Sequence, residues 1–378
     1  MARQFWSALL QHPARRLVWL SLFLITLVLF LFVFFAGGST ALPGPEAGES
    51  AAGIPSSISL SSRLIANATL GFERIFAINL PERSDHRDGL VLATAVSNIT
   101  VEFVEGIHGD KIPAKVLPPN FNQDLNPGSI GSWRAHMNAI RRVVETGAST
   151  ALIIEDDVDW DVRLRTSLDH FATASRSLHT LDSSDKINFR DLPPTQVTHS
   201  PYGEGWDVLW LGHCGMNIPG RAGLVVMEND ETVPEVQYLK SFEEAAWSPL
   251  SAYPQHTRVF MQQTEGTCSL AYAVSQTGAR GILNDLGLNR LTGPFDNMLR
   301  GWCAGLEGSS GHLCFGVLPQ LFDHFRREGS TESDSDISAP SSPYRDKART
   351  LNIRWSVRLN MNKILRGDTN YDDQWPDS

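Results

Sequence analysis

The chain has 378 residues, of which 42% are hydrophobic and 20% are charged, and its formal net charge is −10. This length is sufficient for one large domain or two small ones. The acidic balance argues against a nucleic-acid-binding protein, so no nucleic-acid partner is expected.

The first predicted element is a membrane-spanning helix over residues 17–36, which carry no charge. A helix of this length spans about 30 Å, the hydrocarbon thickness of a bilayer, and secretory apolar regions are shorter. A signal peptide cleaved near Ala41 and a buried core helix are the alternatives. Arginines precede the run, and no charged residue follows it until Glu46. Residues 1–16 are therefore predicted to be a cytoplasmic tail, with the rest of the chain in the lumen.

Two sequons, Asn67-Ala-Thr and Asn98-Ile-Thr, agree with a lumenal orientation. Residues 37–70 are rich in Gly, Pro, Ala and Ser, which predicts a flexible stem. A catalytic domain is expected over 71–345, followed by a C-terminal extension over 346–378. This layout is typical of a single-pass type II membrane protein of the Golgi or the endoplasmic reticulum.

The four cysteines include no CxxC pair, so a zinc site is not expected. In an oxidising lumen an even number of cysteines permits disulfides. Cys303 and Cys314 close a short Gly-rich loop and are the preferred pair. Four buried free thiols are the alternative.

Predicted strands and helices alternate after the stem. Residues 74–80 form a short apolar strand that ends at Pro81. Apolar residues at spacings of three and four predict a helix over 129–146, with Ser129 as its N-cap and Gly147 at its C-terminal end. Residues 151–154 are apolar at every position, as in the interior of a parallel sheet. Further strands are predicted at 100–105, 206–211 and 269–274, helices at 161–178 and 276–286, and loops at 181–205 and 328–342. The alternation predicts an α/β fold with a mainly parallel sheet.

Three adjacent carboxylates, Glu155, Asp156 and Asp157, follow the strand at 151–154 directly. Like charges this close raise one another's pKa, and a divalent cation removes the conflict. Ligands of open α/β sheets bind beyond the carboxyl ends of the strands. Oxygen ligands of this kind suit Mn²⁺ or Mg²⁺, so these residues are predicted to bind such a metal. A solvated acidic turn that caps the next helix is the alternative.

Several segments together resemble glycosyltransferase family 25. The pattern INL-x-x-R-x-x-R of that family matches INLPERSDHR, which ends at Arg87, and its ALILEDD matches ALIIEDD, which ends at Asp157. Its helix motif GEIGCALSH is similar to GSIGSWRAH from Gly128 to His136, although Ser132, Arg134 and Ala135 depart from it. Weaker similarities follow in WDVLWLG, SLAYAVSQTGARGIL, GPFDNML, LPQLFDHF and ESDSDIS. The resemblance covers about residues 72–338.

The resemblance implies a nucleotide-sugar-binding fold of the GT-A type and a metal-dependent glycosyltransferase. The expected reaction moves a hexose from a UDP-sugar to a hydroxyl acceptor with inversion, with galactose as the first choice of donor sugar and glucose as the second. The acceptor is a glycan, a lipid-linked sugar or a protein hydroxyl. A catalytically silent sugar-binding subunit of the same fold and a metal-dependent lumenal hydrolase are the alternatives.

The resemblance also suggests roles for single residues. It adds His324 as a third metal ligand, against the alternative of an ordinary core or surface histidine. Asn79, Arg83 and Arg87 follow the first strand and are expected to contact the uracil or the diphosphate. Asp296 is the candidate general base or sugar contact, with a helix N-cap as the alternative. His136 is expected to be a structural, hydrogen-bonded histidine.

Overall fold

A computed structural model of the chain describes residues 59–182, 185–220, 223–240, 248–262, 265–306, 311–332, 334–337 and 342–378. The predicted tail (1–16), the predicted membrane span (17–36) and the predicted stem as far as residue 58 lie outside the described residues. Within the described ranges, no helix combines the length and the apolar character needed to cross a bilayer.

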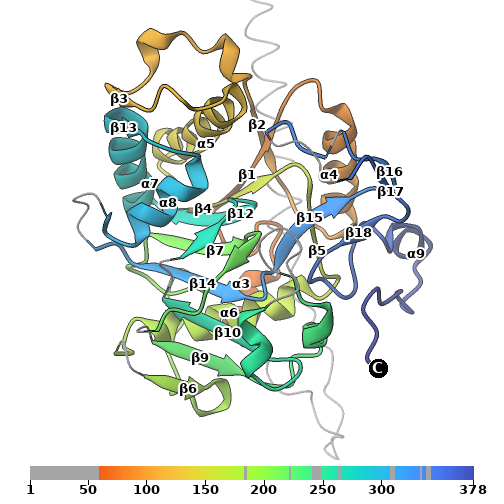
Figure 1. Ribbon diagram of the computed structural model, residues 1–378. Helices are drawn as coiled ribbons and strands as arrows, with labels where there is room; N and C mark the ends of the chain where they lie inside the picture. Colours follow the sequence, from red (N-terminus) through yellow and green to blue (C-terminus); the bar gives the residue numbers. More distant parts are fainter. Residues whose placement is uncertain are drawn as a thin grey trace, which may run out of the picture. The chain divides into compact units, whose positions relative to one another are not determined.

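A central sheet organises the described part of the chain (Figure 1). Its main path runs in the order β2-β1-β4-β12-β7-β14-β10-β9-β6. On this path β10 and β12 run opposite to the other strands. The prediction of an α/β fold with a mainly parallel sheet is therefore confirmed, and this arrangement is consistent with a GT-A-like fold. The strands of the path are β1 Arg74–Asn79, β2 Glu102–Glu105, β4 Thr150–Glu155, β6 Lys186–Asn188, β7 Val208–Gly212, β9 Leu224–Met227, β10 Arg258–Gln262, β12 Ala271–Ser275 and β14 Cys314–Leu318.

Helices pack on both faces of this sheet. In β4, Leu152 and Ile154 belong to one apolar core, and Ala151 and Ile153 belong to the other. Successive side chains of a strand point to opposite faces, so a strand covered on both sides is apolar at every position. One core includes α4 Ser84–Val96 and α6 Leu164–Leu178, and the other includes α5 Pro127–Thr146, α7 Gln276–Ile282 and α8 Phe295–Cys303.

Helix α5 begins two residues before the predicted start. Its N-cap is Asn126, whose side chain accepts a hydrogen bond from the backbone N–H of Ser129, and Pro127 opens the helix. Proline suits that position because its missing N–H has no helical partner there. Gly147 ends the helix in the left-handed conformation, at φ 70°, as predicted. The sequence pattern therefore located the helix but named the wrong cap.

The folded unit extends beyond both predicted boundaries of the catalytic domain. Helix α3 (Leu60–Ile65) lies within the predicted stem, and Ile65 and Leu70 are buried. At the other end, β18 (Arg349–Thr350) pairs with β15 (Phe322–Arg326). Asp159 accepts hydrogen bonds from the hydroxyls of Thr350 and Ser356. Residues 59–70 and 346–378 thus belong to the same folded unit as residues 71–345.

The other predicted elements differ from the observed ones mainly at their ends. The helix predicted at 276–286 ends at Ile282 and continues as a π-helix over Leu283–Asn289. The segment 181–205, predicted as a loop, contains β6. Strands β9, β10, β14 and β15 have no counterpart in the prediction. The other short strands are β3 Asn120–Phe121, β5 Val158–Trp160, β8 Gly215–Met216, β11 Gly266–Thr267, β13 Arg290–Leu291, β16 Gly329–Ser330 and β17 Tyr344–Arg345, and the last α-helix is α9 Met361–Arg366.

Candidate active site

A cleft with a volume of about 1480 Å³ opens where β1 and β4 end. Its lining includes Glu155, which ends β4, the next residues Asp156 and Asp157, and residues of β15. The start of α5 and residues between 342 and 352 contribute further walls. The cleft therefore lies where open α/β sheets bind ligands, and the predicted C-terminal extension forms part of it.

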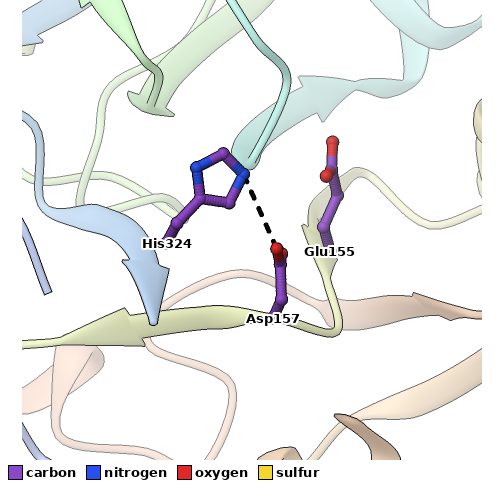
Figure 2. Close-up of side chains that lie close together, drawn as sticks. All are labelled: Glu155, Asp157 and His324. Carbon is purple, nitrogen blue, oxygen red and sulfur yellow. Dashed lines mark ion pairs between the residues drawn. The ribbon is translucent and has the colours of Figure 1, made fainter. Parts of the chain in front are cut away.

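Glu155, Asp157 and His324 come together in this cleft. Each offers one ligand atom, and these atoms lie within 4.8 Å of one another. His324 Nε2 is 3.6 Å from Asp157 Oδ2. Figure 2 shows Glu155 at the end of β4 and Asp157 in the connection after it, while the imidazole of His324 reaches them from β15. Three of the four predicted metal ligands thus share one position.

Strand pairing brings His324 to the carboxylates. β5 follows the acidic residues and pairs antiparallel with β15, with His324 opposite Val158. The backbone N–H of Phe325 donates to the carbonyl of Asp157 at 2.8 Å. The sequence separation of the two segments is large, and this register alone brings the imidazole to the end of β4.

The Asp157 carboxylate is buried, and its neighbours favour the ionised form. Burial alone would raise its pKa, but His324 and Arg326 beside it hold the pKa well below its usual range. Arg326 Nη1 donates to Asp157 Oδ2 at 2.6 Å. The second carboxylate oxygen, Oδ1, is buried and has no hydrogen-bond partner. A buried anionic oxygen without a partner is costly, and a cation at this point would satisfy it.

Asp156 lies outside the metal-ligand cluster, although it was predicted to be a ligand. Its carboxylate accepts from Asn79 Nδ2 at 2.7 Å and bonds to His86 Nδ1 at 2.9 Å. Burial raises the pKa of Asp156, and the contact with His86 opposes that shift. The chain turns between β4 and β5, so adjacent carboxylates point in different directions. Arg358 stabilises this turn through the Asp156 carbonyl, at 2.9 Å.

Glu155 is held by a chain of buried polar groups. The Ser269 hydroxyl donates to Glu155 Oε1 at 3.2 Å and lies 3.1 Å from His136 Nε2. The other imidazole nitrogen of His136 lies 3.0 Å from the Tyr272 hydroxyl, and its ring stacks on Phe295. His136 is therefore a buried, hydrogen-bonded residue of the site, as the sequence suggested.

The three residues expected to contact the nucleotide stand behind the wall of the cleft and are not among its lining residues. Asn79 is buried against Asp156. Arg83 forms ion pairs with Asp85 and Asp336, which fix it at the start of α4. Arg87 lies over the Phe103 ring, 3.9 Å from its centroid.

Asp296, the candidate general base or sugar contact, lines the cleft. Its Oδ2 accepts from the Thr267 hydroxyl at 3.0 Å and from the backbone N–H of Cys268 at 2.7 Å. The alternative of a helix N-cap does not hold, because the residue that caps α8 is Pro294.

Comparison with known proteins agrees with the resemblance read from the sequence motifs. No family profile matches the chain. Procollagen galactosyltransferase 1 of Danio rerio is 22% identical over 242 residues, which cover 61% of this chain and 31% of that protein. Procollagen galactosyltransferase 2 of Mus musculus is 22% identical over 242 residues, 61% of this chain and 29% of that protein. Probable inactive glycosyltransferase 25 family member 3 of Bos taurus is 21% identical over 324 residues, 79% of this chain and 43% of that protein.

The chain is a homologue of glycosyltransferase 25 family proteins. It spans less than half of the length of each of these relatives. Their names include both galactosyltransferases and a protein described as inactive. The comparison thus supports a glycosyltransferase or an inactive protein of the same family.

Two disulfides join all four cysteines of this glycosyltransferase 25 homologue. The preferred pair, Cys303–Cys314, is confirmed, and four free thiols are excluded. The second disulfide, Cys214–Cys268, lies in the cleft wall.

Sequence reasoning about the family motifs missed Arg326, His86 and Ser269. Arg326 follows His324 by two residues, so the period of a strand places both side chains on one face of β15. That signal required the strand itself to be recognised. His86 and Ser269 carried no comparable signal, because their partners are distant in sequence.

Proposed function

We propose that this chain is a metal-dependent glycosyltransferase that transfers a hexose, galactose as the first choice and glucose as the second, from a UDP-sugar to a hydroxyl acceptor. The observation that carries the proposal is the cluster of Glu155, Asp157 and His324 in a large cleft at the end of β4. The galactosyltransferase names of relatives support the choice of sugar.

The residues of the cluster fit a divalent cation such as Mn²⁺ or Mg²⁺. Two carboxylates and one imidazole are suitable ligands for Mn²⁺, and the unpartnered Asp157 Oδ1 gives a cation a place to bind. Burial lowers the pKa of His324, which favours the neutral imidazole that a metal binds, while the charge of Asp157 opposes that shift. When bound, such an ion offsets negative charge on the diphosphate leaving group.

The protein's own residues then have distinct roles. Arg326 keeps Asp157 ionised. Asp296 is the carboxylate that takes the proton of the acceptor hydroxyl. As the hydroxyl oxygen forms its bond to the anomeric carbon, the bond from that carbon to the UDP oxygen breaks, and attack from the opposite face inverts the configuration. The Thr267 hydroxyl and the Cys268 N–H hold the base in place.

The donor is proposed to lie beside the end of β1, where the predicted nucleotide residues support the wall. Asn79 positions Asp156, and Arg83 reaches the cleft through Asp336, which lines it. In this arrangement Asn79, Arg83 and Arg87 act on nucleotide binding indirectly.

We further propose that the folded unit is lumenal and is anchored as a type II membrane protein through residues 17–36. Disulfides persist in oxidising compartments, and this unit has two. Asn67 and Asn98 of the sequons are both exposed, so each has room for a glycan.

A catalytically inactive sugar-binding protein is the second candidate. The relative from Bos taurus, which matches 79% of this chain, carries the word inactive in its name. Such a protein would retain the nucleotide-binding cleft without transferring the sugar.

Release of UDP from UDP-galactose and UDP-glucose by the purified full-length chain, with and without Mn²⁺, tests the proposal. A glycosyltransferase releases UDP when Mn²⁺ is present, slowly onto water and faster with an acceptor, and Asp157→Asn abolishes that release. Binding of Mn²⁺ and UDP without release from any nucleotide sugar supports the inactive candidate. Absence of UDP and Mn²⁺ binding contradicts both candidates.

A further inference from the structure

The Cys214–Cys268 disulfide lies against the metal-ligand cluster. Both cysteines line the cleft. Cys214 Sγ is 4.0 Å from His324 Nδ1, while the other ring nitrogen, Nε2, faces Asp157. A proton on Nδ1, directed at the sulfur, leaves the Nε2 lone pair available for a metal.

The disulfide joins two segments that other contacts also hold in place. Cys268 has a left-handed backbone, at φ 61°, which is unusual for a residue other than glycine. Its N–H donates to Asp296, and its carbonyl accepts from Trp210 Nε1 at 3.0 Å. The N–H of Cys214 donates to the carbonyl of Thr267 at 2.9 Å. The backbone around Cys268 is therefore fixed by several independent contacts.

The residue after Cys268 reaches Glu155, a second member of the cluster. Ser269 follows Cys268, and its buried hydroxyl donates to Glu155. With its proton on Nε2, His136 can donate to the same hydroxyl oxygen and lies 3.5 Å from Glu155 Oε1, while its Nδ1 can accept from the Tyr272 hydroxyl. In this series of hydrogen bonds each group donates to the next, and the last acceptor is the Glu155 carboxylate.

We propose that the Cys214–Cys268 disulfide and Ser269 form one positioning element for the metal site: the disulfide orients His324, and Ser269 orients Glu155. Neither acts on substrate. Groups that orient metal ligands in this way contribute about 10–100-fold to metal affinity. This inference rests on the proposed function, because it assumes that the cluster binds Mn²⁺.

The second disulfide provides a matched control. Cys303 ends α8 and Cys314 begins β14, and both are buried in the core. Neither lines the cleft. Removal of Cys303–Cys314 therefore tests the general stabilising effect of a disulfide without disturbing the cluster.

The test measures binding of Mn²⁺ alone to the full-length chain by isothermal titration calorimetry, beside a thermal melt of each variant. Cys214→Ser/Cys268→Ser should weaken Mn²⁺ binding about 10–100-fold, and Cys303→Ser/Cys314→Ser should leave it unchanged. Pulsed electron paramagnetic resonance of bound Mn²⁺ adds a readout of imidazole coordination, whose nitrogen coupling should diminish in the first variant. Equal Mn²⁺ affinity in a folded Cys214→Ser/Cys268→Ser protein overturns the role of the disulfide.

Ser269→Ala decides the question if the double variant does not fold. It should weaken Mn²⁺ binding about tenfold and retain the nitrogen coupling, because it affects Glu155 and not His324. Ser175→Ala is the control, since Ser175 is also buried and its hydroxyl donates to the Tyr202 carbonyl at 2.8 Å, away from the cleft lining. Unchanged affinity in Ser269→Ala overturns the positioning element. A parent chain that binds no Mn²⁺ refutes the proposed metal site itself, and the inference fails with it.

Discussion

Replacing Asp157 with asparagine removes one negative charge and keeps the shape of the side chain. The sequence alone suggests that this change relieves repulsion among three carboxylates. In the structure, however, Asp157 is the partner of Arg326 at 2.6 Å, and the Arg326 side chain is only 18% exposed. The substitution therefore leaves a largely buried cation without its anionic partner.

The magnitude follows from this contact. A hydrogen bond to a charged group contributes about 1.5–3 kcal/mol, and removal of one member of a fully buried pair costs about 3–5 kcal/mol. Relief of repulsion between Asp156 and Asp157 offsets part of this cost. We expect the free energy of unfolding to fall by about 2 kcal/mol, which lowers the melting temperature by roughly 3 °C for a unit of this size.

The effect on metal binding should be larger than the effect on stability. Asp157→Asn removes an anionic ligand, so we expect Mn²⁺ affinity to fall by about 100-fold, or about 2.7 kcal/mol. Calorimetric titration of Mn²⁺, with and without UDP, beside a thermal melt measures both quantities. Asp156→Asn is the matched control, because that carboxylate is bonded to Asn79 and His86 and lies outside the cluster.

Two results would refute this reasoning. Unchanged Mn²⁺ affinity in Asp157→Asn would place the metal elsewhere, and a larger loss in Asp156→Asn would restore Asp156 as the ligand. Complete unfolding of Asp157→Asn would make the acidic turn a structural element.

Three further predictions concern other parts of the chain. Asp230 and Arg258 form a buried ion pair at 2.6 Å, so Asp230→Asn should lower the free energy of unfolding by about 3–5 kcal/mol in chemical denaturation, and a loss below 1 kcal/mol contradicts this. Burial alone would raise the pKa of Asp230, but Arg258 lowers this pKa from 3.8 to about 2. As the pH falls, Asp230 is therefore protonated in the unfolded chain before it is protonated in the folded one. About 2 kcal/mol of stability is therefore present above pH ~4 and lost as the pH falls to ~2, a loss that Asp230→Asn should lack. Replacement of both Asn67 and Asn98 by glutamine should abolish the mobility shift that endoglycosidase causes, and a remaining shift argues against these sites. Arg83→Ala removes the ion-pair partner of Asp336, which lines the cleft, and should therefore weaken UDP binding. Unchanged UDP affinity in the folded variant would mean that Arg83 has no role in nucleotide binding.

Local sequence patterns determined the elements whose cause is local. The apolar run at 151–154 is a strand covered on both faces, and the three- and four-residue steps of α5 mark its buried stripe. The pattern also placed Glu155 and Asp157 at the carboxyl end of a central strand. These features follow from the spacing of apolar residues along the chain, which can be read directly from the sequence.

Tertiary structure alone decided how the site is completed. His324 reaches Asp157 because β15 pairs with β5 in one register, and Asp156 turns away because the chain bends after β4. The Cys214–Cys268 disulfide and the C-terminal wall of the cleft join segments that are far apart in sequence. Such contacts arise from packing and strand pairing between distant segments, and a local pattern carries no information on which segments meet.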